Sequence, residues 1–183
     1  MGTALARLGA VAPLRDFLDY YRAFQREDGE LPDCVDDHGP EWLPEFDAYG
    51  QYLHGVAEAE RYAPDPAFRA RQAPHVAGAL AKFEALRATR LDATFDTDAL
   101  RARRGLLPES MSHEGYMAQP VHAYWDDFWA LRGLHDAAWL AASGGDAREA
   151  ARRDALTRAF AADLHTSLDL TMAQHGIDFL PGS

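Results

Sequence analysis

Apolar residues recur at three- and four-residue steps along most of the chain, which is the spacing of one face of a helix. The first such stripe lies within 13–25 and comprises Leu14, Phe17, Leu18, Tyr21 and Phe24. Pro13 stands where the first turn of a helix tolerates proline. The pattern therefore predicts a helix over 13–25.

Two further helices are predicted over 48–62 and from Pro66 to about residue 89. Asp47 is suited to the N-cap of the first of them, and Pro66 is suited to the first turn of the second. Because the connection Pro64-Asp65-Pro66 is short, we expect the two helices to form an antiparallel pair.

The last two predicted helices, over 121–142 and 147–174, differ in pattern. In 121–142 large apolar residues fall on more than one face, so this helix is expected to be buried nearly all round. In 147–174 a single apolar face lies opposite several arginines, which is typical of an outer helix. Asp146 can cap this helix at its start, and Gly176 can end it.

The remaining segments are long, acidic and rich in glycine and proline: 28–46, 90–121 and 176 onward. No alternating run rich in Val, Ile and Thr predicts a strand. The sequence therefore predicts a single all-α domain over 1–183, built from antiparallel helical hairpins. Since alternate connections of such a series lie at the same end, the three long loops are expected to meet on one face.

Composition narrows the classes of function. A length of 183 residues suits one domain with a real core. The net charge of −11 argues against a nucleic-acid surface and against docking on anionic lipid. The lone Cys34 excludes an intrachain disulfide and a thiolate zinc cluster.

Targeting signals are weak. The brief apolar stretch at the N-terminus is broken by Arg7 and Pro13, so it does not resemble a signal peptide, and no run approaches membrane-spanning length. A cytoplasmic location is the default expectation, and a periplasmic or secreted location would follow if a signal sequence had been removed.

The densest group of chemically useful side chains runs from Ser112 to Tyr116 and then from Tyr124 to Trp129. It combines carboxylates, a histidine and several aromatic rings across a loop and a helix start. We interpret this stretch as the floor of a polar pocket lined by rings.

Several motifs of this chain resemble those of bacterial six-hairpin glycosidase-like proteins of the (α/α)6 toroid class. The resemblance is most specific at LLPES (106–110), SHEGY (112–116) and YWDDFWALRGL (124–134), and the Tyr-Trp-Asp core is also similar to part of the trehalase signature. EFDAYGQ (45–51) and HGIDFLPG (175–182) fit the loops of that class.

The resemblance implies that the chain forms part of an (α/α)6 toroid. A complete toroid of that class closes a ring of six hairpins, whereas this chain has residues for five or six helices. Glycosidases of the class generally draw their acid and base from opposite sides of the ring. The bowl would then be completed by self-association or by the remainder of a longer chain.

Glycoside hydrolysis uses two carboxyl groups across the scissile bond, and sugar rings need aromatic faces. We expect Glu114 and Asp126 to be the catalytic pair. The residues expected to bind substrate are Asp47, Trp125, Tyr116, Trp42, His113 and Asp178. The expected partner is an oligosaccharide or glycoside.

Structural interpretations compete with these roles. Asp47 can simply be an N-cap, and Asp126 or Asp127 can simply complement the helix dipole. Tryptophans at helical spacing usually pack in a core. Arg132 is expected to pair with Asp136 four residues on.

Other chemistries find less support. His113 and His122 could join acids at a metal, but they lack a recognised ligand spacing, so neither a metal nor a cofactor is predicted. The adjacent Ser112 and His113 lack the turn that marks a nucleophile. The alternative to a glycosidase is a non-catalytic helical module for carbohydrate binding or assembly.

Overall fold

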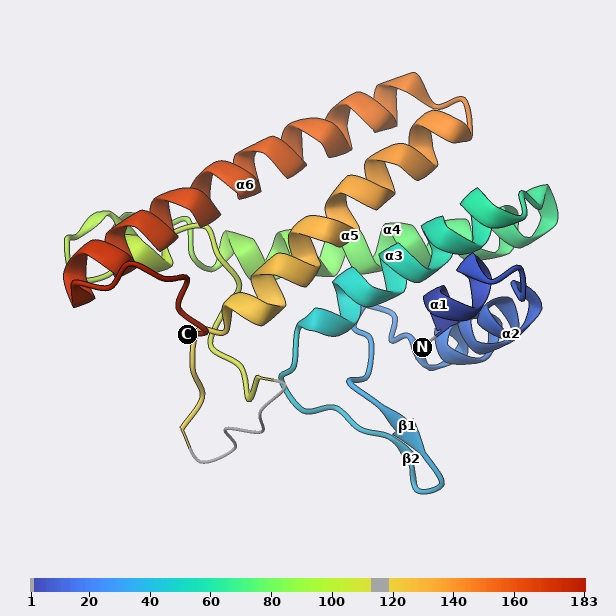
Figure 1. The fold of residues 1–183 in the computed structure, drawn as a ribbon, viewed down its shortest axis with the longest axis horizontal. Coiled ribbons are helices and arrows are strands. Elements are labelled where there is room, and N and C mark those ends of the chain that lie inside the picture. The colour runs from blue at the N-terminus through green and yellow to red at the C-terminus, as the bar shows by residue number, and fades with distance from the viewer. Residues whose placement is uncertain (1, 113–118) are drawn as a thin grey trace.

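The computed structural model describes residues 2–112 and 119–183, and it confirms the all-α class (Figure 1). The four long helices are α3 (Asp47–Tyr62), α4 (Pro66–Ala88), α5 (Tyr124–Ser143) and α6 (Ala147–His175). The shorter elements are α1 (Gly2–Arg7), α2 (Ala12–Tyr21) and the 3-10 turns η1 (Arg22–Phe24), η2 (Ala93–Asp96) and η3 (Arg101–Arg103). The four helices predicted after residue 46 lie close to their expected bounds, whereas α1 was not predicted.

A small β-hairpin interrupts the first long loop, so the prediction that the chain has no strand was wrong here. Strands β1 (Val35–Asp36) and β2 (Gly39–Pro40) pair antiparallel, and the hairpin projects away from the helices (Figure 1). The His38 backbone N–H donates to Asp36 at 2.7 Å, and Gly39 has a φ of +112° that a side chain would disfavour.

Side-chain caps fix the starts of α4 and α6, and the start and end of α6 are as predicted. The Asp65 carboxylate accepts the N–H groups of Ala67 and Phe68 at the start of α4. The Asp146 carboxylate accepts the Glu149 N–H at the start of α6, and Gly176 ends that helix in the left-handed conformation.

Asp47 does not cap α3, so that interpretation was wrong. Phe46 occupies the cap position and Asp47 is the first residue of the helix. The Asp47 carboxylate instead accepts hydrogen bonds from the side chains of Gln51 and Trp125.

Helices α3 and α5 run parallel and cross through two glycines. Asp47 contacts Trp125 near the two starts, and Arg61 contacts Asp136 nearer the two ends. A Cβ atom on Gly133 would lie 2.6 Å from the Gly50 Cα, so the two backbones touch at this point. The distance between the two helices at the crossing is therefore set by backbone atoms and not by side chains.

Helix α6 returns antiparallel along α5 after the turn at Gly144 and Gly145 (Figure 1). Phe83 of α4 and Phe160 of α6 meet edge to face in the core with their ring centroids 5.1 Å apart. None of the described helices is long and apolar enough to cross a bilayer.

One side of α5 remains open to solvent, although this helix was expected to be buried nearly all round. Trp125 and Phe128 are 41% and 42% exposed. Arg132 and His135 continue the same stripe along the helix. The expectation of nearly complete burial was therefore wrong for this face.

The three long loops lie together, as expected for alternate connections. The Met111 N–H donates to the Pro44 carbonyl at 2.9 Å, and the Tyr124 N–H donates to the Gly182 carbonyl at 3.0 Å. Segments from 28–46, 90–121 and the C-terminus thus converge where α3 and α5 begin.

Candidate functional site

Asp47 and Trp125 form the centre of the site where the loops converge. The Asp47 side chain is almost fully buried, and its Oδ2 accepts hydrogen bonds from Trp125 Nε1 at 2.6 Å and Gln51 Nε2 at 2.5 Å. The Trp125 ring also meets Trp129 edge to face with centroids 6.1 Å apart. An indole that is held from two sides and still 41% exposed can offer a ring surface to a ligand.

Asp126 lies behind this pair and is 1% exposed. Its Oδ2 accepts the Phe46 N–H at 3.4 Å. Its Oδ1 is buried and has no hydrogen-bond partner of normal geometry among residues 2–112 and 119–183. The Ser110 hydroxyl lies close enough to the Asp126 carboxyl group to favour its charged form. The Asp126 Oδ1 is suited to carry a proton.

Burial raises the pKa of Asp126 to about 6, and the nearby carboxylates of Asp47 and Glu45 add to that effect. The Ser110 hydroxyl and the Phe46 N–H act in the opposite direction without cancelling it. Asp126 therefore exchanges its proton close to neutral pH, which few aspartates do.

Asp127 has a separate structural role. It is 2% exposed and its Oδ1 accepts the Leu107 N–H at 3.1 Å, so it ties the loop before α5 to the helix. Burial raises the pKa of Asp127 well above its ordinary value.

The charge on Asp126 should reduce stability at neutral pH. Because its pKa is higher in the folded state than in the unfolded chain, the folded protein binds more protons between about pH 4 and pH 6. Stability contributed by the neutral form is therefore lost as pH rises through that window. A pKa of about 6 corresponds to at most about 3 kcal/mol.

We expect Asp126→Asn to raise the free energy of unfolding by about 1–2 kcal/mol at pH 7.5, because the variant removes a buried charge. The gain is smaller than the full charge effect because the variant also weakens some hydrogen bonds of the carboxylate. Thermal melts at pH 4, 6 and 7.5 measure this gain, which should shrink toward pH 4. The exposed Asp98→Asn is the matched control. A variant less stable than the parent at pH 7.5 would contradict the assignment.

A cavity of about 670 Å³ opens beside Asp47, between α1, α2, α3 and the loop 28–46. Its polar lining includes Asp33, Cys34, Glu45, Asp47, Gln51 and His54. Its apolar lining includes Leu5 from α1 and Pro13, Leu14, Phe17 and Leu18 from α2. The cavity shares Asp47 and Trp129 with the Trp125 site, so the two are neighbours.

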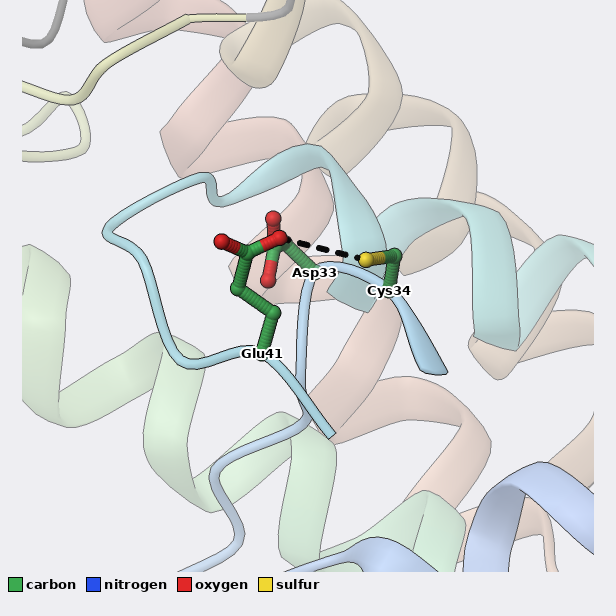
Figure 2. Close-up of side chains that lie close together, drawn as sticks. All are labelled: Asp33, Cys34 and Glu41. Atoms are coloured by element: carbon green, nitrogen blue, oxygen red, sulfur yellow. Dashed lines mark hydrogen bonds between the residues drawn. The ribbon is translucent and has the colours of Figure 1, made fainter. Parts of the chain in front are cut away.

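Asp33, Cys34 and Glu41 are the described residues whose ligand atoms could surround a metal ion (Figure 2). One atom from each lies within 4.8 Å of the others, and the Cys34 thiol donates to Glu41 Oε2 at 3.3 Å. A thiol that donates a hydrogen bond is protonated and is therefore a poor metal ligand. The contact between Cys34 and Glu41 is therefore a hydrogen bond between a thiol and a carboxylate.

Partial desolvation and the hydrogen bond to Glu41 raise the pKa of the Cys34 thiol to about 11, and the Asp33 charge adds to this. Cys34 is exposed, so a reagent can reach its thiol. A variant of Glu41 can then test how much the neighbouring carboxylates contribute to the raised pKa of this thiol. We expect iodoacetamide to alkylate Cys34 roughly a hundredfold more slowly at pH 8 than an ordinary thiol, since the thiolate is the reacting form.

Glu41→Gln should speed that alkylation, and Glu27→Gln, which changes an exposed acid elsewhere, should leave it unchanged. Mass spectrometry of the modified chain over time gives both rates. Equal rates for the parent and Glu41→Gln would show that the carboxylate does not control the thiol.

The other predicted site residues are less concentrated. His113, Glu114 and Tyr116 lie outside the described residues. The Arg26 guanidinium covers the Trp42 ring at 3.5 Å from its centroid, and Asp178 is exposed in the C-terminal segment. The structure thus brings together Asp47, Trp125 and Asp126 from the predicted set.

A buried charge network next to the cavity was only partly predicted. Arg132 pairs with Asp136 at 2.8 Å, which confirms the expected intrahelical pair. His54 Nδ1 lies 2.7 Å from the same carboxylate, and Arg61 donates to it at 2.6 Å. The contributions of His54 and Arg61 were missed because sequence spacing does not reveal that α3 and α5 are neighbours.

Comparison of the chain with protein-family models, with curated proteins and with solved structures found no match. The resemblance to six-hairpin glycosidases therefore rests on the sequence motifs alone.

Proposed function

We propose that the protein is carbohydrate-active and hydrolyses a glycosidic bond in an oligosaccharide by carboxylate acid–base catalysis. The observation that carries this proposal is the Asp47–Trp125 pair: a buried carboxylate on the wall of a cavity that orients a half-exposed indole. Sugar-binding sites combine such ring faces with carboxylates that accept hydroxyl hydrogen bonds.

In this proposal Glu114 and Asp126 supply the two carboxyl groups. A pKa of about 6 lets Asp126 hold a proton in the range where a general acid must release it. Trp125 stacks on a sugar ring, and Asp47 positions Trp125. Trp42, Tyr116, His113 and Asp178 remain further candidates for contacts with the sugar.

We also propose that the helices form part of an (α/α)6 toroid. The parallel pair α3 and α5 would belong to its inner ring, with α4 and α6 outside. The part of the open face of α5 with Phe128, Arg132 and His135 lies where another hairpin would pack. Self-association or the remainder of a longer chain would provide that hairpin.

The direct test is hydrolysis of chromogenic aryl glycosides and of oligosaccharides by the full chain. We expect Glu114→Gln and Asp126→Asn each to reduce the rate at least a hundredfold, in line with the loss of an acid–base catalyst. Glu27→Gln and Asp98→Asn change exposed acids and should retain the parent rate. Full activity in both active-site variants would overturn the catalytic assignment.

The second candidate is a non-catalytic carbohydrate-binding or assembly module. The near-complete burial of Asp126 favours it, because a substrate must reach an acid that acts on it. This candidate predicts a sugar-induced change in tryptophan fluorescence without hydrolysis. Trp125→Ala should abolish that change.

A further inference from the structure

We propose that the cavity beside Asp47 binds a protonated amine, and that the sugar bound there is an amino sugar. The choice of a sugar rests on the proposed function, whereas the positive charge of the ligand follows from the cavity itself. Three features of the cavity support the proposal: the charges on its polar wall, the Oδ1 atom of Asp47 and the apolar wall opposite.

The polar wall is negatively charged. Asp33, Glu45 and Asp47 line it, and no Lys or Arg is among the described residues around the cavity. The Cys34 thiol on the same wall is protonated at neutral pH because of its raised pKa. An anionic ligand such as a uronate would meet acidic side chains on this wall, and none of the lining residues that the structure describes is a Lys or Arg that could bind it.

Asp47 offers a specific anchor for an ammonium group. It is 4% exposed, and both hydrogen bonds that it receives from described residues end on Oδ2. Its Oδ1 is therefore available to accept from a ligand. Hydrogen bonds between an ammonium and a carboxylate are roughly twice as strong as neutral ones.

His54 is the remaining ionisable group on this wall. Its Nδ1 lies 2.7 Å from an Asp136 oxygen and 3.2 Å from Arg132 Nε, so this edge of the ring faces the buried charge network between α3 and α5. His54 is therefore already paired with Asp136 and is not the partner of the acids on the cavity wall.

The opposite wall accommodates the body of the ligand. Phe17 and Leu14 present apolar surface there. Tyr21 and Tyr52 line the cavity with their rings, because their hydroxyls are already bonded to the Pro32 carbonyl and the Gln72 side chain. Aromatic faces attract organic cations and the C–H faces of sugars alike. A volume of about 670 Å³ lies within the range of small-ligand sites.

The test is calorimetric titration of the full chain with four probes: glucosamine, glucose, glucuronate and benzylamine. We expect glucosamine to bind about tenfold or more tightly than glucose, with glucuronate weaker than both. Benzylamine should bind as well, because it has the same ammonium group on an apolar body. Added salt should weaken the two amines and leave glucose unchanged.

The other outcomes separate the two proposals. Binding of benzylamine without any sugar supports the charge of the ligand and overturns the amino sugar, and it counts against carbohydrate activity. Glucose bound as tightly as glucosamine overturns the amine inference and leaves carbohydrate activity standing. No measurable binding of any probe overturns the inference as a whole.

Variants locate the effect. Asp47→Asn keeps an acceptor for the Trp125 indole but removes the charge, so it should weaken glucosamine about tenfold and glucose little. Glu45→Gln tests a second acid of the wall if Asp47→Asn folds poorly. The exposed Asp98→Asn should change neither affinity. Equal loss of glucosamine and glucose binding in the acid variants would contradict a role for charge.

Discussion

Replacing Gly50 with alanine is expected to lower the free energy of unfolding by about 3 kcal/mol, which is a large fraction of the stability of an ordinary domain. The added Cβ would run into the Trp129 carbonyl group and would lie 2.7 Å from the Ala130 nitrogen. Both obstacles are backbone atoms of α5, which cannot rotate away as a side chain can. The helices would have to separate.

The helix propensity of alanine opposes this effect by only about 1 kcal/mol. Thermal melts and urea titrations of Gly50→Ala and the parent measure the difference, with about 2–4 °C expected for each kcal/mol in a chain of this size.

Gly55→Ala is the matched control, because it lies in the same helix and its Cβ would meet a side-chain methyl, Leu18 Cδ2, at 3.2 Å. That methyl can shift, so the variant should be within about 1 kcal/mol of the parent. Equal stabilities for Gly50→Ala and Gly55→Ala would mean that the helices do not meet backbone to backbone.

Replacing Asp136 with asparagine should also be severe, with an expected loss of about 3 kcal/mol at neutral pH. The Asp136 carboxylate is fully buried and contacts His54, Arg61 and Arg132. Removing its charge leaves these donors without their anion. Since the Arg132 side chain is 47% exposed and can turn to water, we place the loss at the lower end for a buried pair.

The effect of Asp136→Asn should depend on pH. Burial alone would raise the pKa of Asp136, but the hydrogen bonds from His54 and Arg61 and the arginine charges outweigh it and hold the pKa below its ordinary value. The stabilisation is therefore present above the unfolded pKa, about 4, and is lost as pH falls through the folded pKa. The difference between parent and variant should narrow in acid.

Urea titrations at pH 7 and pH 3 measure that difference. The control is Asp154→Asn, which breaks an exposed pair with Arg158 on α6 and should cost less than about 0.5 kcal/mol. A difference that stays constant between the two pH values would show that Asp136 carries no stabilising charge.

Local signals made much of the helical fold predictable. The Asp146 cap and the left-handed Gly176 are set by residues within one turn of each end of α6, so sequence alone locates them. The hairpin of β1 and β2 could not be foreseen, because strands of two residues are too short to show alternation. Helix α1 was missed for a similar reason, since six residues provide less than two turns of periodicity.

The sequence predicted several residues of the site, but it predicted their arrangement in space less well. The motif at 124–134 led to Asp126 and Trp125, and the structure places both beside Asp47. The role of Asp47 was misjudged because an aspartate before an apolar stripe usually caps a helix. The cavity could not be foreseen, since it depends on how α1 and α2 pack beside α3.

The contact between Gly50 and Gly133 has a consequence for the exchange of amide protons with deuterated solvent. Where two backbones touch, water reaches the peptide groups only when the helices part. The amides around Gly50 and Gly133 should therefore be among the last to exchange, and those of α1 among the first. Such a map would identify this junction as the part of the molecule that opens only on global unfolding.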